Sequence, residues 1–124
     1  MPDKKAVPAS GLGHLRIVLT DTAYIGPGRA DLLAGIAETG SIAAAGKTMA
    51  MSYKRAWELV QALNAGFGAA LVETNRGGAK QGGAVLTPLG QEVLALYRRM
   101  QAKAEAAIAD DVETLRQRIP DISP

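Results

Sequence analysis

The sequence predicts a mostly α-helical fold with a small β-wing, and two observations predict it. Apolar residues recur at steps of three and four along most of the chain, as they do in amphipathic helices. Residues 71–74 and 84–87 instead resemble two short strands on either side of a glycine-rich connection. The length of 124 residues allows one domain with a single hydrophobic core.

The N-terminal region is expected to contain one short strand. Residues 1–13 mix proline, lysine, glycine and serine without periodicity, which predicts a flexible leader. In residues 14–20, Leu15, Ile17 and Leu19 alternate with other side chains, which is typical of a half-buried strand. His14 opens this stretch, and a single imidazole without a histidine or carboxylate cluster nearby is structural more often than catalytic.

Two helices are expected next. Pro27 suits the first turn of a helix because its missing N–H is not needed there, and Gly40 supplies a left-handed stop. Ser41 is a good N-cap for a second, short helix. Small residues make this helix thin, which permits a close crossing with its neighbours. Its apolar face is formed by Ile42, Ala45 and Met49.

A third helix is predicted after a tight break at Ala50 and Met51. Ser52 is its N-cap, and the helix runs to about residue 67. Lys54 and Arg55 lie in the first turn, on the side opposite the apolar stripe. That stripe consists of Tyr53, Ala56, Val60, Leu63 and Phe67.

The rest of the domain is expected to be a hairpin and one long helix. Residues 75–83 connect the two short strands and contain two cations and no acid, which predicts a positively charged tip. Thr87 and Pro88 are the N-cap and first residue of the long helix, which can continue past a possible break at Asp110 and Asp111. We place the domain at residues 14–110 and a helical or frayed tail at 111–124.

A small domain cannot cover so long an apolar stripe alone, so the last helix predicts a dimer. The predicted dimerisation residues are Val93, Leu96, Tyr97, Met100, Ala104 and Ile108.

This order of elements is that of a winged helix-turn-helix protein, in which the second helix of the motif enters the major groove with its first turn near the bases. Residues 41–83 carry five basic and two acidic residues, a net charge of +3, whereas residues 101–124 carry three basic and five acidic ones, a net charge of −2. The sequence therefore predicts duplex DNA as a partner. The predicted DNA-binding residues are Ser41, Lys47, Ser52, Tyr53, Lys54, Arg55, Arg76 and Lys80.

Alternative interpretations of these residues stay open. The ring of Tyr53 fits the buried stripe, so a core or half-buried position is predicted at least as strongly as a DNA contact. Lys54 can pair with Glu58 one turn later as part of a solvated face. The third helix can also contact a protein, which would make the chain a winged-helix interaction module without DNA binding. Affinity for DNA falls steeply with salt, and this dependence separates the two functions.

The composition argues against other classes of function. The chain has no cysteine and one histidine, so we expect neither a metal site nor a cofactor. Glu38, Glu73 and Glu92 have no evident partner base or nucleophile, and we expect no enzyme. No phosphate-loop signature is present, and no apolar run is long enough for a membrane span. We therefore expect a cytoplasmic protein.

Three segments resemble the N-terminal DNA-binding domain of the ModE family of molybdate-responsive regulators, namely residues 37–45 (AETGSIAAA), 51–57 (MSYKRAW) and 86–90 (LTPLG). More distantly they resemble the DNA-binding head of LysR-type regulators. The resemblance covers about residues 14–110. It implies a winged-helix dimer that represses, or both activates and represses, molybdenum-related genes from a palindromic operator. ModE proteins also carry C-terminal molybdate-binding domains, which this sequence lacks, so the resemblance implies a separate molybdate-sensing partner or no response to molybdate.

Overall fold

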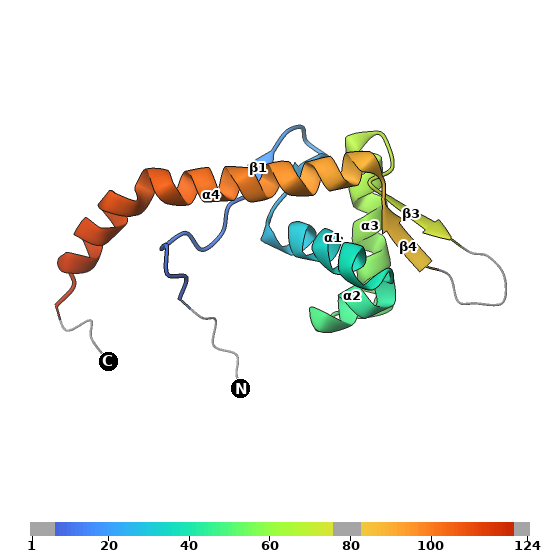
Figure 1. The fold of residues 1–124 in the computed structure, drawn as a ribbon, viewed down its shortest axis with the longest axis horizontal. Coiled ribbons are helices and arrows are strands. Elements are labelled where there is room, and N and C mark those ends of the chain that lie inside the picture. Colours follow the sequence, from blue (N-terminus) through green and yellow to red (C-terminus); the bar gives the residue numbers. More distant parts are fainter. Residues whose placement is uncertain (1–6, 76–82, 121–124) are drawn as a thin grey trace.

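The computed structural model describes residues 7–75 and 83–120, and the predicted mostly helical fold with a β-wing is confirmed (Figure 1). Within these residues, three helices pack into a compact unit, a hairpin lies at its edge, and a long helix extends past it. The elements are β1 (Ile17–Val18), β2 (Tyr24–Ile25), α1 (Pro27–Thr39), α2 (Ile42–Thr48), α3 (Tyr53–Phe67), β3 (Val72–Asn75), β4 (Gly83–Leu86) and α4 (Pro88–Gln117).

The predicted N-terminal strand is shorter than expected. It is limited to β1, which pairs antiparallel with β2 so that Ile17 lies opposite Ile25. The reason is a turn, because the Thr20 hydroxyl accepts a hydrogen bond from the Ala23 amide (2.9 Å) and ends the pairing. Leu19, which the alternation placed inside, is 57% exposed as a result.

The predicted boundaries of α1 and α2 are confirmed by their caps. Pro27 is the first residue of α1, and Gly40 ends this helix in the left-handed conformation, with a φ of 72°. The Ser41 hydroxyl accepts a hydrogen bond from the Ala44 amide (3.0 Å) at the start of α2. Because a cap of this kind contributes about 1 kcal/mol, two adjacent caps fix the corner between α1 and α2.

The turn between α2 and α3 is tight. Ala50 adopts a positive φ of 57°, so the chain cannot continue as a helix after α2. The Ser52 hydroxyl then accepts a hydrogen bond from the Arg55 amide (3.0 Å) and caps α3, as predicted. The two helices of the motif are therefore joined by four residues, 49–52.

The three helices approach closely because small residues lie where they cross. A Cβ atom built at Gly46 of α2 would lie 2.9 Å from the Cβ atom of Ala56 in α3, and one built at Gly35 of α1 would lie 2.9 Å from that of Ala45 in α2. This confirms that α2 is a thin helix. The largest fully buried side chains are Leu32, Leu33, Ile36, Val60, Leu63, Leu71 and Tyr97.

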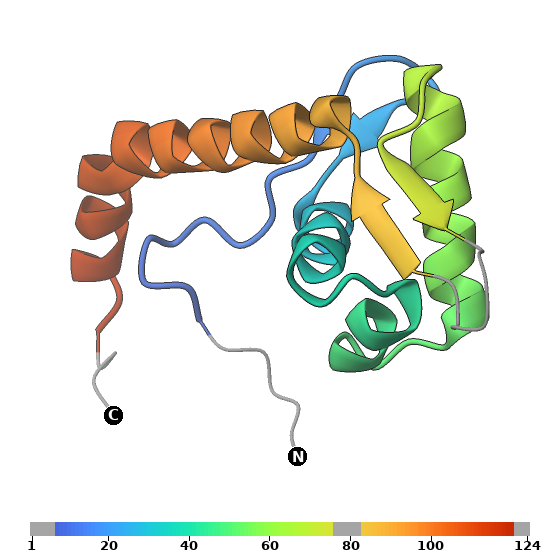
Figure 2. The same cartoon turned by 45° about the vertical axis from the view of Figure 1, so that its right-hand side comes forward.

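The wing, formed by β3 and β4, is attached to both α3 and the corner before α2. The Asn64 side chain accepts hydrogen bonds from the amides of Leu71 (2.8 Å) and Val72 (3.2 Å) and donates one to the Val72 carbonyl (3.1 Å). The Ala84 amide donates to the Gly40 carbonyl (2.9 Å). These bonds hold the described part of the wing beside the helix-turn-helix motif, as Figure 2 shows.

The last helix, α4, is continuous through Asp110 and Asp111, so the possible break there does not interrupt it. Figures 1 and 2 show that it leaves the domain and changes direction toward its C-terminal end. It is capped as predicted by Thr87, whose hydroxyl accepts from the Gly90 amide (3.0 Å). Among the described helices, none has the length and apolar character needed to cross a membrane.

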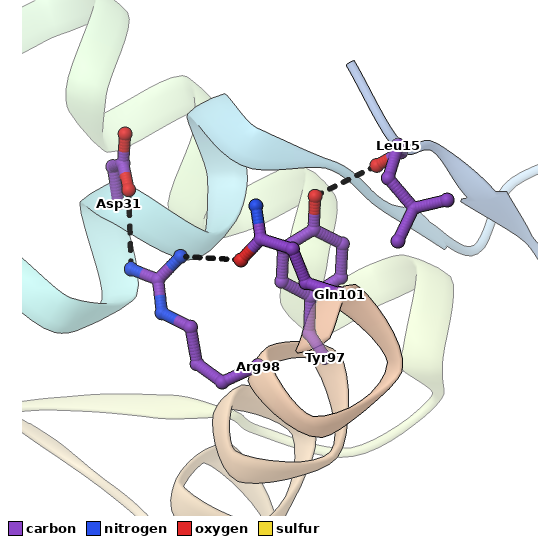
Figure 3. Close-up of polar contacts among 5 residues, drawn as sticks. All are labelled: Leu15, Asp31, Tyr97, Arg98 and Gln101. Atoms are coloured by element: carbon purple, nitrogen blue, oxygen red, sulfur yellow. Dashed lines mark hydrogen bonds and ion pairs between the residues drawn. The ribbon is translucent and has the colours of Figure 1, made fainter. Parts of the chain in front are cut away.

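Two polar contacts anchor the first half of α4 to the domain (Figure 3). The Tyr97 hydroxyl donates a hydrogen bond to the Leu15 carbonyl (2.7 Å). The Arg98 guanidinium forms an ion pair with Asp31 of α1, with 3.1 Å between Nη2 and Oδ1. Burial raises the pKa of the Tyr97 hydroxyl, and Asp31 raises it further while Arg98 opposes the shift.

Candidate nucleic-acid interface

The first turn of α3 carries the strongest candidate residues, and all of them are exposed. Ser52, Tyr53, Lys54 and Arg55 project from the end of the helix that follows the tight turn. The buried stripe of α3 begins only at Ala56. This first turn combines a hydroxyl group, two cations and the positive end of the helix dipole.

Tyr53 is the residue for which the sequence left two positions open. Its side chain is 56% exposed, so it is not part of the core. One turn later, Trp57 is 42% exposed, and sequence reasoning did not select it. The signal was present in the four-residue spacing of two large aromatic rings, which places them on one face of the helix. Two aromatic faces are therefore available beside the two cations.

Lys54 does have the intrahelical partner that the sequence suggested. Its Nζ atom lies 4.0 Å from Oε2 of Glu58, and the two side chains are 83% and 49% exposed. An exposed pair of this kind contributes at most about 1 kcal/mol and is screened by salt. A phosphate group can therefore compete with Glu58 for Lys54.

The candidates on α2 lie at its two ends. Ser41 is half-buried at the N-terminus, where its hydroxyl caps the helix, and Lys47 is exposed in the last turn. Ser41 directly follows Gly40, whose carbonyl accepts the bond from β4. Ser41 is therefore close to the wing, and Lys47 is close to the turn that leads into α3.

The two predicted wing contacts, Arg76 and Lys80, lie outside the described residues. The strands on either side are described, and they pair from Val72 opposite Leu86 to Asn75 opposite Gly83. Figures 1 and 2 show the open end of this hairpin at the same end of the domain as the N-terminus of α3. Asn75 and Gly83, the described residues at this open end, thus lie toward the end of the domain at which α3 begins.

The predicted dimerisation residues of α4 differ in their exposure. Tyr97 is fully buried within its own chain, so its side chain cannot contact a second copy without leaving the core. Val93 is half-buried and packs against the core of the same chain. Leu96 is 38% exposed, and Met100, Ala104 and Ile108 are half-buried. Further along, Leu115 and Ile119 are 66% and 53% exposed, although the predicted surface did not include them.

Arg55 also belongs to a second group of cations that the sequence did not reveal. The guanidinium carbons of Arg16 and Arg29 lie 4.0 Å and 3.7 Å from the centre of the Tyr24 ring. These residues line one cavity with Arg55 and His14. His14 and Arg16 precede β1, Tyr24 lies in β2, Arg29 lies in α1 and Arg55 lies in α3. No local spacing in the sequence therefore indicates that these residues meet.

Comparison with known proteins places this geometry in a family. A family model described as a bacterial regulatory helix-turn-helix protein of the lysR family matches residues 29–91, from α1 to the start of α4. The molybdenum-pterin-binding protein MopB of Rhodobacter capsulatus is 46% identical over 87 residues, which are 69% of this chain and 32% of MopB. The DNA-binding transcriptional dual regulator ModE of Escherichia coli K12 is 38% identical over 100 residues, which are 78% of this chain and 38% of ModE. The chain thus spans about a third of the length of these relatives.

Solved structures agree with the fold. The crystal structure of a CbnR_DBD-DNA complex is similar, with a TM-score of 0.55 and 26% identity, over 70% of this chain and 94% of that one. A LysR family transcriptional regulator matches 67% of this chain and 27% of its own, with a TM-score of 0.51 and 19% identity, which supports the fold alone.

Proposed function

This chain belongs to the lysR family of bacterial regulatory helix-turn-helix proteins, and we propose that it binds duplex DNA to regulate molybdenum-related genes. One observation carries the proposal: the exposed first turn of α3, with Lys54 and Arg55, projects from a helix-turn-helix motif beside a wing. A regulator of this kind acts in the cytoplasm, by binding rather than by catalysis.

We propose that the first turn of α3 reads the major groove. Arg55 carries a guanidinium that can bind the O6 and N7 atoms of guanine with two hydrogen bonds, and Lys54 supplies a mobile charge for a base or a phosphate. The Ser52 hydroxyl accepts from the Arg55 amide, and its own proton stays available for a phosphate oxygen. The exposed rings of Tyr53 and Trp57 provide apolar contacts for thymine methyl groups or sugars.

Contacts with the DNA backbone are proposed on either side of this helix. We propose that Ser41 and Lys47, at the two ends of α2, hold phosphates that flank the major groove. Arg76 and Lys80 of the wing connection are proposed to reach the backbone or the minor groove. Phosphate contacts of this kind fix the orientation of the protein, and they carry no sequence information of their own.

We propose that the protein acts as a homodimer on a palindromic operator. The support is an apolar row along α4, formed by Leu96, Met100, Ala104 and Ile108, that the described part of the chain does not fully cover. A second copy related by two-fold symmetry would bury this row and present two α3 helices to two half-sites. We leave Tyr97 out of this surface because its own chain already buries it.

The link to molybdenum rests on the relatives. MopB is a molybdenum-pterin-binding protein by name, ModE of Herbaspirillum seropedicae is a molybdenum transport protein by name, and the latter is 44% identical over 72 residues. We propose that the target genes belong to the same metabolism. We also propose that a separate partner senses molybdate for this protein.

A protein-interaction module is the second candidate, because exposed Tyr53 and Trp57 on α3 are residue types enriched at protein interfaces. Salt dependence separates the two functions. We expect the logarithm of DNA affinity to fall linearly with the logarithm of salt concentration, with a slope of about −0.9 for each phosphate contacted. A flat salt response would favour the protein-interaction function.

The decisive experiment is selection of bound fragments from random duplexes. A recovered palindrome would establish DNA binding, two-fold symmetry and the operator together. Recovery of unrelated sequences, with an affinity no higher than for random duplex, would contradict the proposed function.

A further inference from the structure

A cavity of 280 Å³ lies between the β1–β2 hairpin, the start of α1 and one side of α3. It lies apart from the described wing strands and from the apolar row of α4, and the proposed function gives no role to its lining residues other than Arg55. A water molecule takes about 30 Å³ of the liquid, so the cavity has room for a small ion together with some of its hydration shell.

The charge of the cavity has one sign. Arg16, Arg29 and Arg55 line it together with His14, and its lining contains no carboxylate. Over residues 7–75 and 83–120, none of these three arginines lies within 4.0 Å of a carboxylate oxygen, because the ion pairs there join Lys54 to Glu58 and Arg98 to Asp31. Three uncompensated guanidinium groups around one space attract an anion.

Two of the guanidinium groups are held in place before any ligand binds. Both Arg16 and Arg29 pack on the ring of Tyr24, at 4.0 Å and 3.7 Å from its centre. Arg29 also donates a hydrogen bond from Nη1 to the Tyr24 carbonyl (3.3 Å). Groups with fixed positions lose little conformational freedom when they bind, which favours affinity.

One hydrogen-bond donor of Arg29 has no acceptor among the described residues. Its Nε atom is buried, and within the described residues it has no hydrogen-bond partner. Buried donors in native proteins are almost always paired, so an unpaired one calls for a ligand or another acceptor.

The backbone at the start of α1 adds to the attraction. Gly26 is the N-cap residue, and no side chain caps this helix. The cavity reaches Gly26, Pro27 and Gly28, and a Cβ atom built at Gly28 would meet nothing within 4 Å. Pro27 has no N–H, so Gly28 is the first residue of this 13-residue helix with an amide, and it lines the cavity at the end of the helix where the dipole favours negative charge.

We propose that this cavity binds a small tetrahedral oxyanion, of the class of phosphate, sulfate or molybdate. Guanidinium groups match such ions because their paired N–H donors fit two oxygen atoms at once. Arg55 belongs both to the cavity and to the first turn of α3. If Arg55 contacts DNA, as the proposed function requires, a bound ion and the operator compete for its guanidinium.

The binding step is tested on the full chain without DNA. Sodium sulfate, sodium phosphate and sodium molybdate are titrated by calorimetry, with sodium chloride keeping the ionic strength constant. We expect saturable binding of at least one dianion. Arg16→Gln and Arg29→Gln should each weaken it at least tenfold, whereas Arg118→Gln, which removes an exposed cation at the far end of α4, should leave it unchanged.

Loss of the stacked Arg29 can also affect folding, so Arg16→Gln, at an exposed position, is the deciding variant, and circular dichroism checks its fold. The proposal is overturned if no dianion binds saturably, or if Arg16→Gln binds as tightly as Arg118→Gln. It is also overturned if no dianion binds without DNA while both cavity variants lower DNA affinity, since the cavity would then hold a backbone phosphate.

The competition is tested with the duplex recovered by selection, at constant ionic strength. We expect the dianion that binds best to lower the DNA affinity of the wild-type protein and to leave that of Arg29→Gln unchanged. An unchanged wild-type affinity would refute the competition while the site itself stands. Failure of the wild type to bind any duplex would refute the proposed function, and the titration without DNA would still decide the cavity.

Discussion

Substitution of Gly90 by alanine should destabilise the protein by displacing the wing from α4. A Cβ atom built at Gly90 would lie 2.1 Å from the carbonyl oxygen of Leu71. An ordinary contact between a carbon and an oxygen atom is at least about 3.3 Å, so one of the two backbones must move by about 1 Å. Leu71 is fully buried, and its carbonyl accepts the Thr87 amide at 2.9 Å, so neither side moves freely.

The expected magnitude follows from three contributions. Overpacking in a rigid site costs about 1–3 kcal/mol, and weakening the bond between Thr87 and Leu71 costs about 1 kcal/mol. The higher helix propensity of alanine returns about 1 kcal/mol. The free energy of unfolding should therefore fall by about 1–3 kcal/mol, which lowers the melting temperature by roughly 4–12 °C for a chain of this length.

The assay is thermal unfolding followed by circular dichroism at 222 nm, at one protein concentration because a dimer makes the melting temperature concentration-dependent. Gly28→Ala is the matched control, since Gly28 also lies in the first turn of a helix and has no atom within 4 Å of a built Cβ. It should be as stable as the wild type or slightly more stable. Equal melting temperatures for the two variants would refute the argument from the close contact.

Four further outcomes are expected. Arg55→Ala should weaken binding to the selected duplex by about 1–3 kcal/mol if Arg55 reads a base, against no change for Arg118→Ala in the same gel-shift titration. Asn64→Ala should lower the free energy of unfolding in urea by about 1–3 kcal/mol, because it leaves the amides of Leu71 and Val72 without their acceptor; an unchanged midpoint would contradict this. Burial raises the pKa of Tyr97, so the folded state keeps this proton when the unfolded state has lost it. The contribution of this group to the free energy of unfolding is complete below about pH 10 and is lost as the pH rises through the folded-state pKa. Tyr97→Phe should therefore reduce the loss of stability at alkaline pH. If the stability of the variant and of the wild type falls in parallel with pH, Tyr97 is not the cause of that loss. Leu96→Glu should yield monomers in analytical ultracentrifugation, and persistence of dimers would exclude Leu96 from the interface.

The sequence predicted the helices well because their signals are local. Ser41, Ser52 and Thr87 each bond to the amide three residues later, and that interaction depends only on the neighbouring backbone. The buried stripe from Ala56 to Leu63 follows from the helical period in the same way. Local signals therefore predicted the order of the helices and wing strands and most helix ends, but they did not predict β2.

Features that depend on distant residues were not predicted. The helical period places Tyr53 on the same stripe as the core residues of α3, yet its side chain is 56% exposed, because burial also requires a distant part of the chain to cover it. The cation cluster at Tyr24 needs a hairpin to bring Arg16 and Arg29 to one ring across 13 positions of sequence. Lys54 and Arg55 were found because they are adjacent, whereas Arg16 and Arg29 were missed because only the fold unites them with Arg55.

The length of α4 has a consequence for operator choice. A helix of 30 residues is about 45 Å long when straight, and Tyr97 and Arg98 attach its first half to the domain. In a dimer built on α4, the level at which two copies meet would set the separation between their recognition helices. A shift of one helical turn, about 5.4 Å, exceeds the 3.4 Å rise of a base pair. Substitutions on α4, far from any base, would thereby change which half-site spacing the protein accepts.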